Sequence, residues 1–336
     1  MSRTPLTVIK GDGIGPAIVD AALEVLDALD AEFDYEYVKV GQAALDDGEK
    51  EALPESAIES IERTGLALKG PTTTPSGGGY SSVNVAIRKR FDLYANVRPA
   101  VSMTGAKPLY DDLDIIIVRE NEHGMYSGEG QTLSDDGERG EACSVITRSQ
   151  SERIIRFAFE LARARGRKKV TLAHKANILK TTSGLFLSVG GEIAKEYDDL
   201  EYDDVIVDAG AMKLVMDPYQ FDVIVAPNLF GDILSDLCAG LVGGMGLAPG
   251  ANIGDDCAVF EAVHGSAPDI AGQNIANPTS VLLATALLFD HLNDKDKADR
   301  IRRAVRSAIA ERDRITPDLD GEGTTDSFTQ AVVERL

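Results

Sequence analysis

The stretch LTVIKGDGIGPAIV, residues 6–19, joins an apolar run to a helical pattern through three alternating glycines. Dinucleotide-binding folds place a loop of the form G-x-G-x-x-G at such a junction. The glycines here are Gly11, Gly13 and Gly15, and Pro16 occupies the place of the pattern's last glycine. Proline lacks the backbone N–H and the small size that close helix packing requires at this place. The stretch therefore predicts a tight turn from a strand into a helix and not a Rossmann nucleotide site.

The acidic residue of a Rossmann fold is missing as well. Such a fold carries an acid about 20 residues after the glycines, at the end of the second strand. Here the second apolar run, FDYEYVKVG at residues 33–41, ends in Val40-Gly41. Along the whole chain, β-branched runs alternate with stretches of helical period, which is typical of an α/β fold with a largely parallel sheet.

Two helices can be placed from their patterns. One follows Gly15, with Pro16 at its first position. Its inward face comprises Ile18, Ala22, Val25 and Leu29. The other is predicted to begin at Ser149, with Glu152 completing a capping box, and to end before Gly166.

The composition excludes some classes of partner. The 336 residues carry 34 Lys and Arg against 55 Asp and Glu, a net charge of −21, which disfavours binding to nucleic acid or to an anionic membrane. No run of 18 or more apolar residues and no signal-peptide pattern is present, so we expect neither a membrane span nor export. Three scattered cysteines argue against a disulfide framework. These features predict a cytoplasmic protein.

Polar residues end five of the apolar runs. In open α/β sheets, ligands bind beyond the carboxyl ends of the strands, so these residues are candidates for one site. Any one of them could simply end its strand at water, but that explanation accounts poorly for all five. They are Lys69, Arg119, Lys175, Asp208 and Asn228.

Two carboxylates stand four residues apart in NLFGDILSDLCAGL, residues 228–241. A helix is predicted from about Gly231, which places Asp232 and Asp236 on one face near its start. Two oxygen ligands this close suit Mg²⁺ or Mn²⁺. The alternative is that the two acids lie there only because the positive end of the helix dipole favours negative side chains.

Three arginines form a second candidate group. Arg88, Arg98 and Arg119 each carry the planar fork that binds carboxylates, although each alone would be read as a surface charge. FEAVHGSAPDIAGQNIANP, residues 260–278, is rich in Gly, Pro, Ser and Asn and is predicted to contain no helix. Loops of this composition are either disordered or binding surfaces held by a scaffold.

Several long motifs occur in a fixed order along the chain. They are GDGIGP, KGP-TTP, NVAIRK-FDLYANVRP, VREN--G-YSG, HKAN, NLFGDILSD, GLAPGANIG and HGSAPDIAG-NIANP. Through them the sequence resembles the decarboxylating β-hydroxyacid dehydrogenases, the isocitrate and 3-isopropylmalate dehydrogenase family, over essentially its whole length. The resemblance implies an isopropylmalate dehydrogenase-like fold of two α/β domains. It also implies that a 2-hydroxy acid is oxidised by NAD(P)⁺ and then decarboxylated, with isocitrate dehydrogenases that use NAD as the most similar members.

The resemblance also implies roles for the candidate residues. Positions that match the metal ligands are Asp232, Asp236 and, from the partner subunit, Asp208, with Mg²⁺ or Mn²⁺ as the ion. Lys175, also from the partner, matches the residue that handles the hydroxyl proton, and Tyr126 matches the acid. The substrate contacts would be Asn177 and the arginines Arg88, Arg98 and Arg119. The resemblance therefore implies a homodimer in which each active site is built from residues of both subunits.

Coenzyme recognition in this family runs through the 260–278 loop. Asp269 is the position that selects the coenzyme, because a carboxylate accepts from ribose hydroxyls but repels a 2′-phosphate. Members that use NADP carry a Lys-Tyr pair where this chain has Asp269-Ile270, so NAD⁺ is predicted. The remaining candidate contacts are Lys69, Thr74, His264, Gly265, Ser266, Ala267 and Asn277.

Substrate choice rests on Ser82 and Asn84. Isocitrate members resemble this chain at these positions, whereas isopropylmalate members carry leucines, and a hydroxyl and an amide facing an isopropyl group would lose hydrogen bonds worth about 1 to 3 kcal/mol each. Isocitrate is therefore favoured over isopropylmalate and homoisocitrate. The pair Glu122-His123 departs from the family pattern and adds a negative charge beside the arginines. A non-catalytic regulatory subunit is a remote alternative.

The resemblance predicts a discontinuous domain arrangement. Residues 1–99 and 249–336 would form a large domain with the coenzyme loop. Residues 100–248 would form a small domain with the metal site and the dimer contacts. Within it, residues 124–147 match an arm that clasps the partner, although their sequence has no clear strand pattern.

Overall fold

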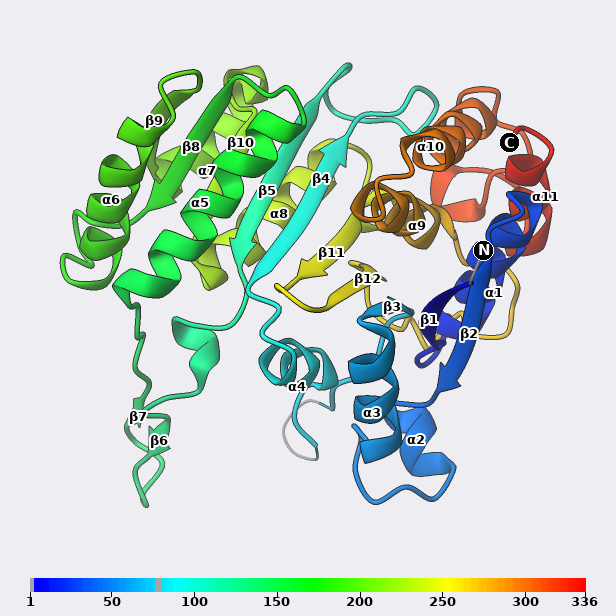
Figure 1. The fold of residues 1–336 in the computed structure, drawn as a ribbon, viewed down its shortest axis with the longest axis horizontal. Helices are drawn as coiled ribbons and strands as arrows, with labels where there is room; N and C mark the ends of the chain where they lie inside the picture. Colours follow the sequence, from blue (N-terminus) through cyan, green and yellow to red (C-terminus); the bar gives the residue numbers. More distant parts are fainter. Residues whose placement is uncertain (1–2, 76–79) are drawn as a thin grey trace. The chain divides into compact units, whose positions relative to one another are not determined.

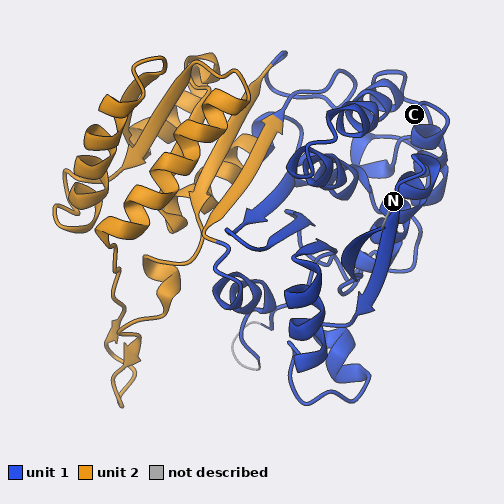
Figure 2. Ribbon diagram, in the orientation of Figure 1, with its two compact units in different colours: residues 1–93, 101–112, 239–336 blue, residues 94–100, 113–238 orange. Residues whose placement is uncertain are grey.

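A computed structural model describes residues 3–75 and 80–336. The chain divides into two compact units (Figure 2). Unit 1 comprises residues 1–93, 101–112 and 239–336, and unit 2 comprises residues 94–100 and 113–238. The unit boundaries therefore differ from the predicted boundaries near residues 99 and 248. The role of each domain stays a prediction.

Unit 1 is built on a mostly parallel run of strands (Figure 1). In sheet order these are β2 (Phe33–Val38), β1 (Thr4–Ile9), β3 (Leu66–Lys69), β12 (Ala258–Ala262) and β11 (Pro249–Ile253). Only β11 pairs antiparallel, with β12. Its helices are α1 (Gly15–Ala28), α2 (Gln42–Asp46), α3 (Glu55–Thr64), α4 (Val83–Arg90), α9 (Thr279–His291), α10 (Lys295–Ala310) and α11 (Thr325–Val333).

The helix predicted after the glycines is confirmed as α1. It begins at Gly15 with Pro16 in its first turn, and Ile18, Ala22 and Val25 are fully buried. This apolar face packs against α9 and α11. The 260–278 loop contains no helix, as predicted.

Unit 2 has its own set of strands. In sheet order these are β4 (Ala95–Val101), β5 (Asp114–Glu120), β10 (Val223–Ala226), β8 (Lys169–His174) and β9 (Glu201–Ile206). From β5 to β9 every pairing is parallel, so the carboxyl ends of these strands lie along one edge. The helices are α5 (Arg148–Ala164), α6 (Thr182–Ile193), α7 (Val207–Met216) and α8 (Asn228–Leu241), which ends in unit 1.

Three predicted element ends in unit 2 are wrong. Helix α5 begins at Arg148, because the side chain of Thr147, and not of Ser149, accepts the first free N–H, from Gln150. Helix α8 begins at Asn228, three residues before the predicted start, which places Asp232 one turn inside it. Strand β9 ends at Ile206, so Asp208 lies in the first turn of α7.

The predicted arm is a thin extension of unit 2 (Figures 1 and 2). It contains two short antiparallel strands, β6 (Thr132–Leu133) and β7 (Gly140–Glu141). At its base, the N–H of Gly124 donates to the carbonyl of Val145. Backbone pairing thus gives the arm a form that its side-chain pattern does not reveal.

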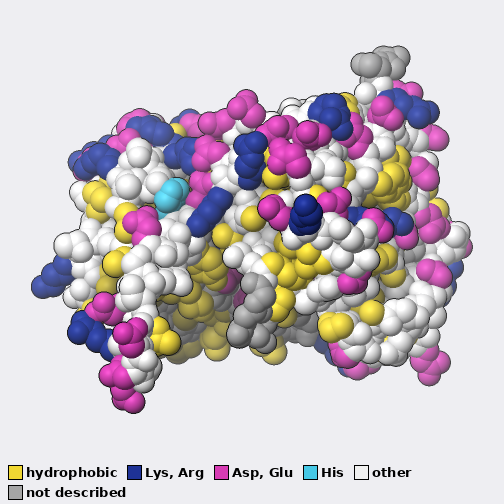
Figure 3. Space-filling model, turned by 90° about the horizontal axis from the view of Figure 1, so that it is seen from below, with side chains coloured by type: hydrophobic (Ala, Val, Ile, Leu, Met, Phe, Trp, Pro, Cys, Tyr) yellow, Lys and Arg dark blue, Asp and Glu magenta, His cyan; other side chains and the backbone are white. Residues whose placement is uncertain are grey.

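Acidic and basic side chains are spread over the face drawn in Figure 3. The cysteines Cys143, Cys238 and Cys257 are all free. Within the described residues, no helix combines the length and the apolar character needed to cross a membrane.

Candidate active site

The carboxylate of Asp232 is the centre of a charged cluster in unit 2. Its Oδ2 accepts a hydrogen bond of 2.6 Å from the hydroxyl of Tyr126. Its Oδ1 accepts from the guanidinium of Arg119 and, at 3.4 Å, from that of Arg98. Arg98 reaches Asp236 at the same distance. The structure thus brings together five predicted residues from β4, β5, α8 and the short 3-10 turn at Met125–Ser127.

The two arginines are held by Asn228, which the sequence singled out, and by Asn96 and Ser235, which it did not. Arg119 donates from Nε and Nη2 to Oδ1 of Asn228, at 3.0 and 2.7 Å. Arg98 donates to Asn96 and to the hydroxyl of Ser235, at 2.7 and 2.8 Å. Both guanidinium groups are therefore oriented before any substrate arrives, and their remaining donors point at the acids.

A glycine makes room for Arg119. A Cβ at Gly231 would lie 2.7 Å from the Cβ of Arg119, which is closer than carbon atoms can approach. Helix α8 can therefore pass this close to β5 only with a glycine at this position. The predicted helix start at Gly231 was wrong, and the glycine acts by its size and not by ending the helix.

Burial changes the acidity of two members of this cluster. Desolvation, followed by the hydrogen bond to Asp232, raises the pKa of Tyr126 above its usual value of 10.0. The hydroxyl therefore keeps its proton at neutral pH. Desolvation also raises the pKa of Asp236, against the opposing charge of Arg98.

The cluster contains two of the three predicted metal ligands, Asp232 and Asp236. Hard oxygen ligands suit Mg²⁺ and Mn²⁺, and a cation would offset the desolvation of Asp236. The third predicted ligand, Asp208, does not complete a close group of three with these acids in a single chain. Among residues 3–75 and 80–336, the group of three that lies close enough to hold a metal ion is a different one. A complete site would thus need a ligand from outside the chain.

Lys175 and Asp208 form a separate pair. Lys175 follows β8, and its Nζ lies 2.5 Å from Oδ1 of Asp208 at the start of α7. The hydrogen bond from Lys175 lowers the pKa of Asp208. Asp208 is largely exposed and Asn177, two residues beyond Lys175, is exposed as well. The pair therefore lies at the surface of unit 2.

Arg88, unlike the other two arginines, belongs to unit 1. In unit 1, its Nη2 donates to Glu261 at 3.1 Å, and Nζ of Lys69 donates to the same carboxylate at 2.9 Å. All three side chains are more than nine-tenths buried. The Nε of Arg88 is buried without a partner among the described residues, which leaves one donor for an anion.

Glu261 is a residue that the sequence analysis missed. Burial alone would raise its pKa, but the charges of Lys69 and Arg88 and the hydrogen bonds from Lys69 and Asn252 outweigh burial and lower the pKa below its usual value. The signal was available, because a glutamate inside the apolar run AVFEA must have a buried partner.

The predicted selectivity residues have structural partners. The hydroxyl of Ser82 caps α4 by accepting the N–H of Val85 at 3.4 Å. Oδ1 of Asn84 accepts from Thr72 at 3.1 Å. Among the described residues, the NH₂ group of Asn84 has no hydrogen-bond partner, so both of its N–H donors are open to a ligand.

The coenzyme loop also offers an unused polar atom. Desolvation lowers the pKa of His264, and its buried Nε2 has no partner within the part of the chain that the structure describes. Asp269 is exposed, and Asn277 is buried, donating to Asp318 at 2.9 Å. An orphaned imidazole nitrogen and an exposed carboxylate in one loop fit an adenosine group, which offers both donors and acceptors. Of the other candidates, Gly265 and Ser266 lie in the same loop, exposed and buried respectively, and Thr74 is exposed in the segment after β3.

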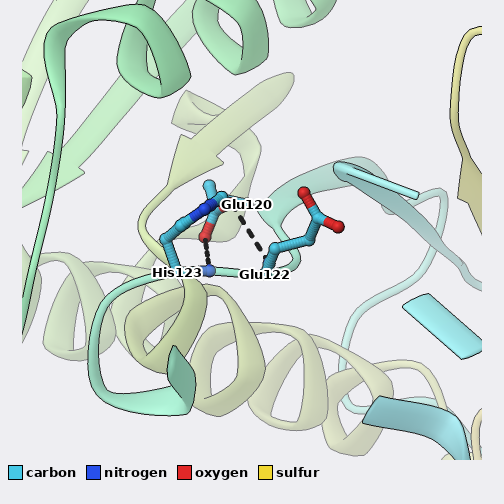
Figure 4. Close-up of side chains that lie close together, drawn as sticks. All are labelled: Glu120, Glu122 and His123. Carbon is cyan, nitrogen blue, oxygen red and sulfur yellow. Dashed lines mark hydrogen bonds and ion pairs between the residues drawn. The ribbon is translucent and has the colours of Figure 1, made fainter. Parts of the chain in front are cut away.

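Glu122 pairs with an arginine outside the cluster. Its carboxylate, 7% exposed, pairs with Arg153 at 3.3 Å. Beside it, Glu120 accepts from Nδ1 of His123 at 3.0 Å and from the N–H groups of both residues (Figure 4). Glu120, Glu122 and His123 are close enough to share a metal ion, but these contacts already occupy the carboxylates. The unexpected negative charge is neutralised within the protein.

Comparison with known proteins shows the family to which the chain belongs. The model of the family described as isocitrate/isopropylmalate dehydrogenase matches residues 5–334. The catalytic subunit 5 of mitochondrial NAD isocitrate dehydrogenase from Arabidopsis thaliana is 45% identical over 340 residues, covering 100% of this chain and 90% of that protein. A 3-isopropylmalate dehydrogenase from Archaeoglobus fulgidus is 46% identical over 331 residues, covering 98% and 99%. The crystal structure of isocitrate dehydrogenase from Methylococcus capsulatus has a TM-score of 0.95 and 52% identity, covering 98% of each chain.

These matches define a dehydrogenase over the whole chain. It belongs to the isocitrate/isopropylmalate dehydrogenase family. The resemblance seen in the sequence and the predicted fold class are thereby confirmed.

The comparisons contradict the predicted cytoplasmic location. The Arabidopsis relative is named mitochondrial, and so are relatives from Caenorhabditis elegans and Schizosaccharomyces pombe. The prediction depended on three free cysteines, which indicate a reducing compartment but do not distinguish one such compartment from another.

Proposed function

We propose that the chain is an isocitrate dehydrogenase that uses NAD⁺ and a divalent metal ion and forms 2-oxoglutarate and CO₂. The observation that carries this proposal is the meeting of Tyr126, Arg98 and Arg119 at the carboxylate of Asp232. One proton donor, two carboxylate-binding cations and two acids are the groups that oxidation and decarboxylation of a hydroxy acid require.

Each group has a chemical task in this reaction. Arg98 and Arg119 would bind the carboxylates of the substrate, since their guanidinium groups are already oriented by Asn96, Ser235 and Asn228. Lys175 of the partner subunit would take the hydroxyl proton while the hydride passes to NAD⁺. Tyr126 would return a proton to the substrate carbon after CO₂ leaves, because its raised pKa keeps the hydroxyl protonated.

Asp232 and Asp236, with Asp208 of the partner subunit, would hold Mg²⁺ or Mn²⁺. The bound ion would polarise the substrate's oxygens and stabilise the negative charge that decarboxylation develops. Without the ion, Arg98 and Arg119 balance the charge of Asp232.

A homodimer would complete the site. Large apolar side chains on the same helices as the acids are exposed, with Met212 and Met216 on α7 at 55% and 72% and Ile233 on α8 at 56%. Exposed apolar residues beside a charged site are typical of a subunit interface. We propose that a second copy of the chain covers them and supplies Lys175 and Asp208.

Shared sites predict recovery of activity in mixed dimers. Lys175→Met and Asp232→Asn should each inactivate the homodimer. In a dimer that contains one chain of each variant, one of the two sites is intact, so random mixing should restore about a quarter of the wild-type activity. The measurement is specific activity after co-expression of the two variants.

A matched pair serves as the control for this experiment. Asp232→Asn mixed with Asp236→Asn leaves every site with a defect, because both acids come from the same side of a site. No recovery is expected for that pair. Equal activities of the two mixtures would show that the sites are not shared.

The substrate is tested by one assay. NADH formation is followed with isocitrate, 3-isopropylmalate and homoisocitrate in parallel, with Mg²⁺ or Mn²⁺ present. We expect isocitrate to have the highest kcat/KM, and Asn84→Leu to reduce this preference by about tenfold or more, because the free amide donors of Asn84 are lost. A higher kcat/KM for another acid would replace isocitrate as the substrate, and failure of all three acids would favour the regulatory subunit.

The coenzyme preference is predicted to depend on Asp269. This exposed carboxylate has no hydrogen bond from another group in the described ranges, so it is available to ribose hydroxyls. The wild type should have a kcat/KM for NAD⁺ at least about a hundredfold above that for NADP⁺. Asp269→Lys with Ile270→Tyr should reverse much of this ratio. The prediction fails if the wild type uses NADP⁺ as efficiently as NAD⁺.

A further inference from the structure

The GDGIGP loop has no part in the proposed chemistry, yet it makes an unusual set of contacts. The carboxylate of Asp12 is 7% exposed and accepts three backbone N–H groups from two other segments. Oδ2 accepts from Thr73 at 2.8 Å and from Gln42 at 3.3 Å, and Oδ1 accepts from Ala43 at 2.9 Å. A single side chain thus ties the loop to the segment before Thr74 and to the start of α2.

The glycines bring the loop against both segments that carry predicted coenzyme contacts. A Cβ at Gly11 would lie 2.1 Å from the carbonyl oxygen of Pro71, and a Cβ at Gly13 would lie 2.0 Å from that of Ser266. Both glycines have positive φ, at 73° and 58°. Only glycine allows this approach, so the alternating glycines serve close packing between loops.

Hydrogen bonds link the GDGIGP loop, the segment at Pro71 to Thr73 and the loop at Ser266 to one another. The N–H of Ile14 donates to the carbonyl of Ser266 at 2.9 Å, and the N–H of Asp12 donates to the carbonyl of Pro71 at 2.8 Å. The hydroxyls of Thr73 and Ser266 lie 2.8 Å apart. Thr73 is therefore held by Asp12 through its N–H and linked to Ser266 through its hydroxyl.

We propose that Asp12 is a positioning residue for the coenzyme, which holds Thr73 and, through it, the loop around Ser266 at the spacing that bound NAD⁺ requires. This inference rests on the proposed function. It adds a role for the GDGIGP motif, which supports the coenzyme loop and does not bind the nucleotide as a Rossmann loop would. Asp12 can fill this role because both oxygens of a carboxylate accept hydrogen bonds, so one side chain holds three backbone N–H groups. Asparagine in its place has one acceptor oxygen and turns an NH₂ group toward backbone N–H donors.

The test compares Asp12→Asn and Thr73→Val with the wild type and with Asp27→Asn, which changes an exposed acid on α1. Binding of NADH is measured by calorimetry, and KM for each substrate and kcat by the NADH assay. In Asp12→Asn, the Kd for NADH and the KM for NAD⁺ should rise by about tenfold or more, the factor for a lost hydrogen bond to a charged group. The kcat and the KM for isocitrate should stay within about twofold, because Asp12 bonds Gln42, Ala43 and Thr73, none of which is a proposed substrate-binding or catalytic residue.

Thr73→Val tests the same path without touching the buried carboxylate. It should weaken NADH binding by about threefold or more through loss of the hydroxyl contact with Ser266. Hydrogen exchange of residues 264–270 should become faster in both variants and stay unchanged in Asp27→Asn. The inference is overturned if both variants bind NADH as the wild type does, or if kcat and both KM values fall or rise together. If the wild type itself does not bind NADH, the proposed coenzyme is wrong and this inference fails with it.

Discussion

Replacing Asp232 by asparagine is expected to lower kcat/KM for isocitrate by about a thousandfold or more. The carboxylate contacts Tyr126 at 2.6 Å and both Arg119 and Arg98. The amide that replaces it keeps the shape but loses the negative charge that orients two cations and binds a divalent ion. The substitution therefore affects the metal, the substrate clamp and the proton donor together.

The measurement is steady-state kinetics at saturating Mn²⁺, together with calorimetric titration of Mn²⁺ into the protein. The matched control is Asp198→Asn, which removes a negative charge at an exposed position of unit 2. The control should keep kcat/KM within about twofold. A variant Asp232→Asn that retains more than a tenth of wild-type kcat/KM would remove Asp232 from the centre of the proposed site.

Glu261→Gln is expected to reduce the free energy of unfolding by about 3 to 5 kcal/mol. The carboxylate is the buried counter-ion of both Lys69 and Arg88, whose side chains are 1% and 9% exposed. Glutamine leaves two cations without an anion in a region that water does not reach. The measurement is urea unfolding followed by circular dichroism, and Glu24→Gln, at an exposed position of α1, is the control with no expected change.

The pH dependence gives an independent check on Glu261. Its pKa in the folded protein lies below the usual 4.5, so its contribution to stability is fully present above about pH 4.5 and is lost as the pH falls through the lowered value. The difference in unfolding free energy between wild type and Glu261→Gln should therefore be constant from pH 7 to about pH 5 and should shrink in more acidic solution. A difference that grows on acidification would contradict the buried ion pairs.

Arg88 shows how far the sequence alone could lead. Its type and position predicted a grip on carboxylates together with Arg98 and Arg119, and those two do meet at Asp232. Arg88 pairs with Glu261, 173 residues away along the chain. Nothing local to either residue indicates that pairing, because it depends on helix α4, which carries Arg88, meeting strand β12, which carries Glu261.

Glu122 and Asp12 are similar cases. The sequence placed Glu122 beside the arginines as an unfavourable charge, and only the course of α5 brings Arg153 to neutralise it. Asp12 was part of a failed nucleotide motif, and its carboxylate was found to join segments 30 and 61 residues away.

By itself, the sequence determined the α/β class, the helix after Gly15 and the polar residues that follow the strands, because period, capping and strand ends are local properties of the chain. It also determined the family, through motifs that span the whole length. Only the tertiary structure decided which of these polar residues share a charge or a hydrogen bond. Buried ions must find partners within about 4 Å, and residues far apart in sequence become neighbours only when the strands that carry them pair.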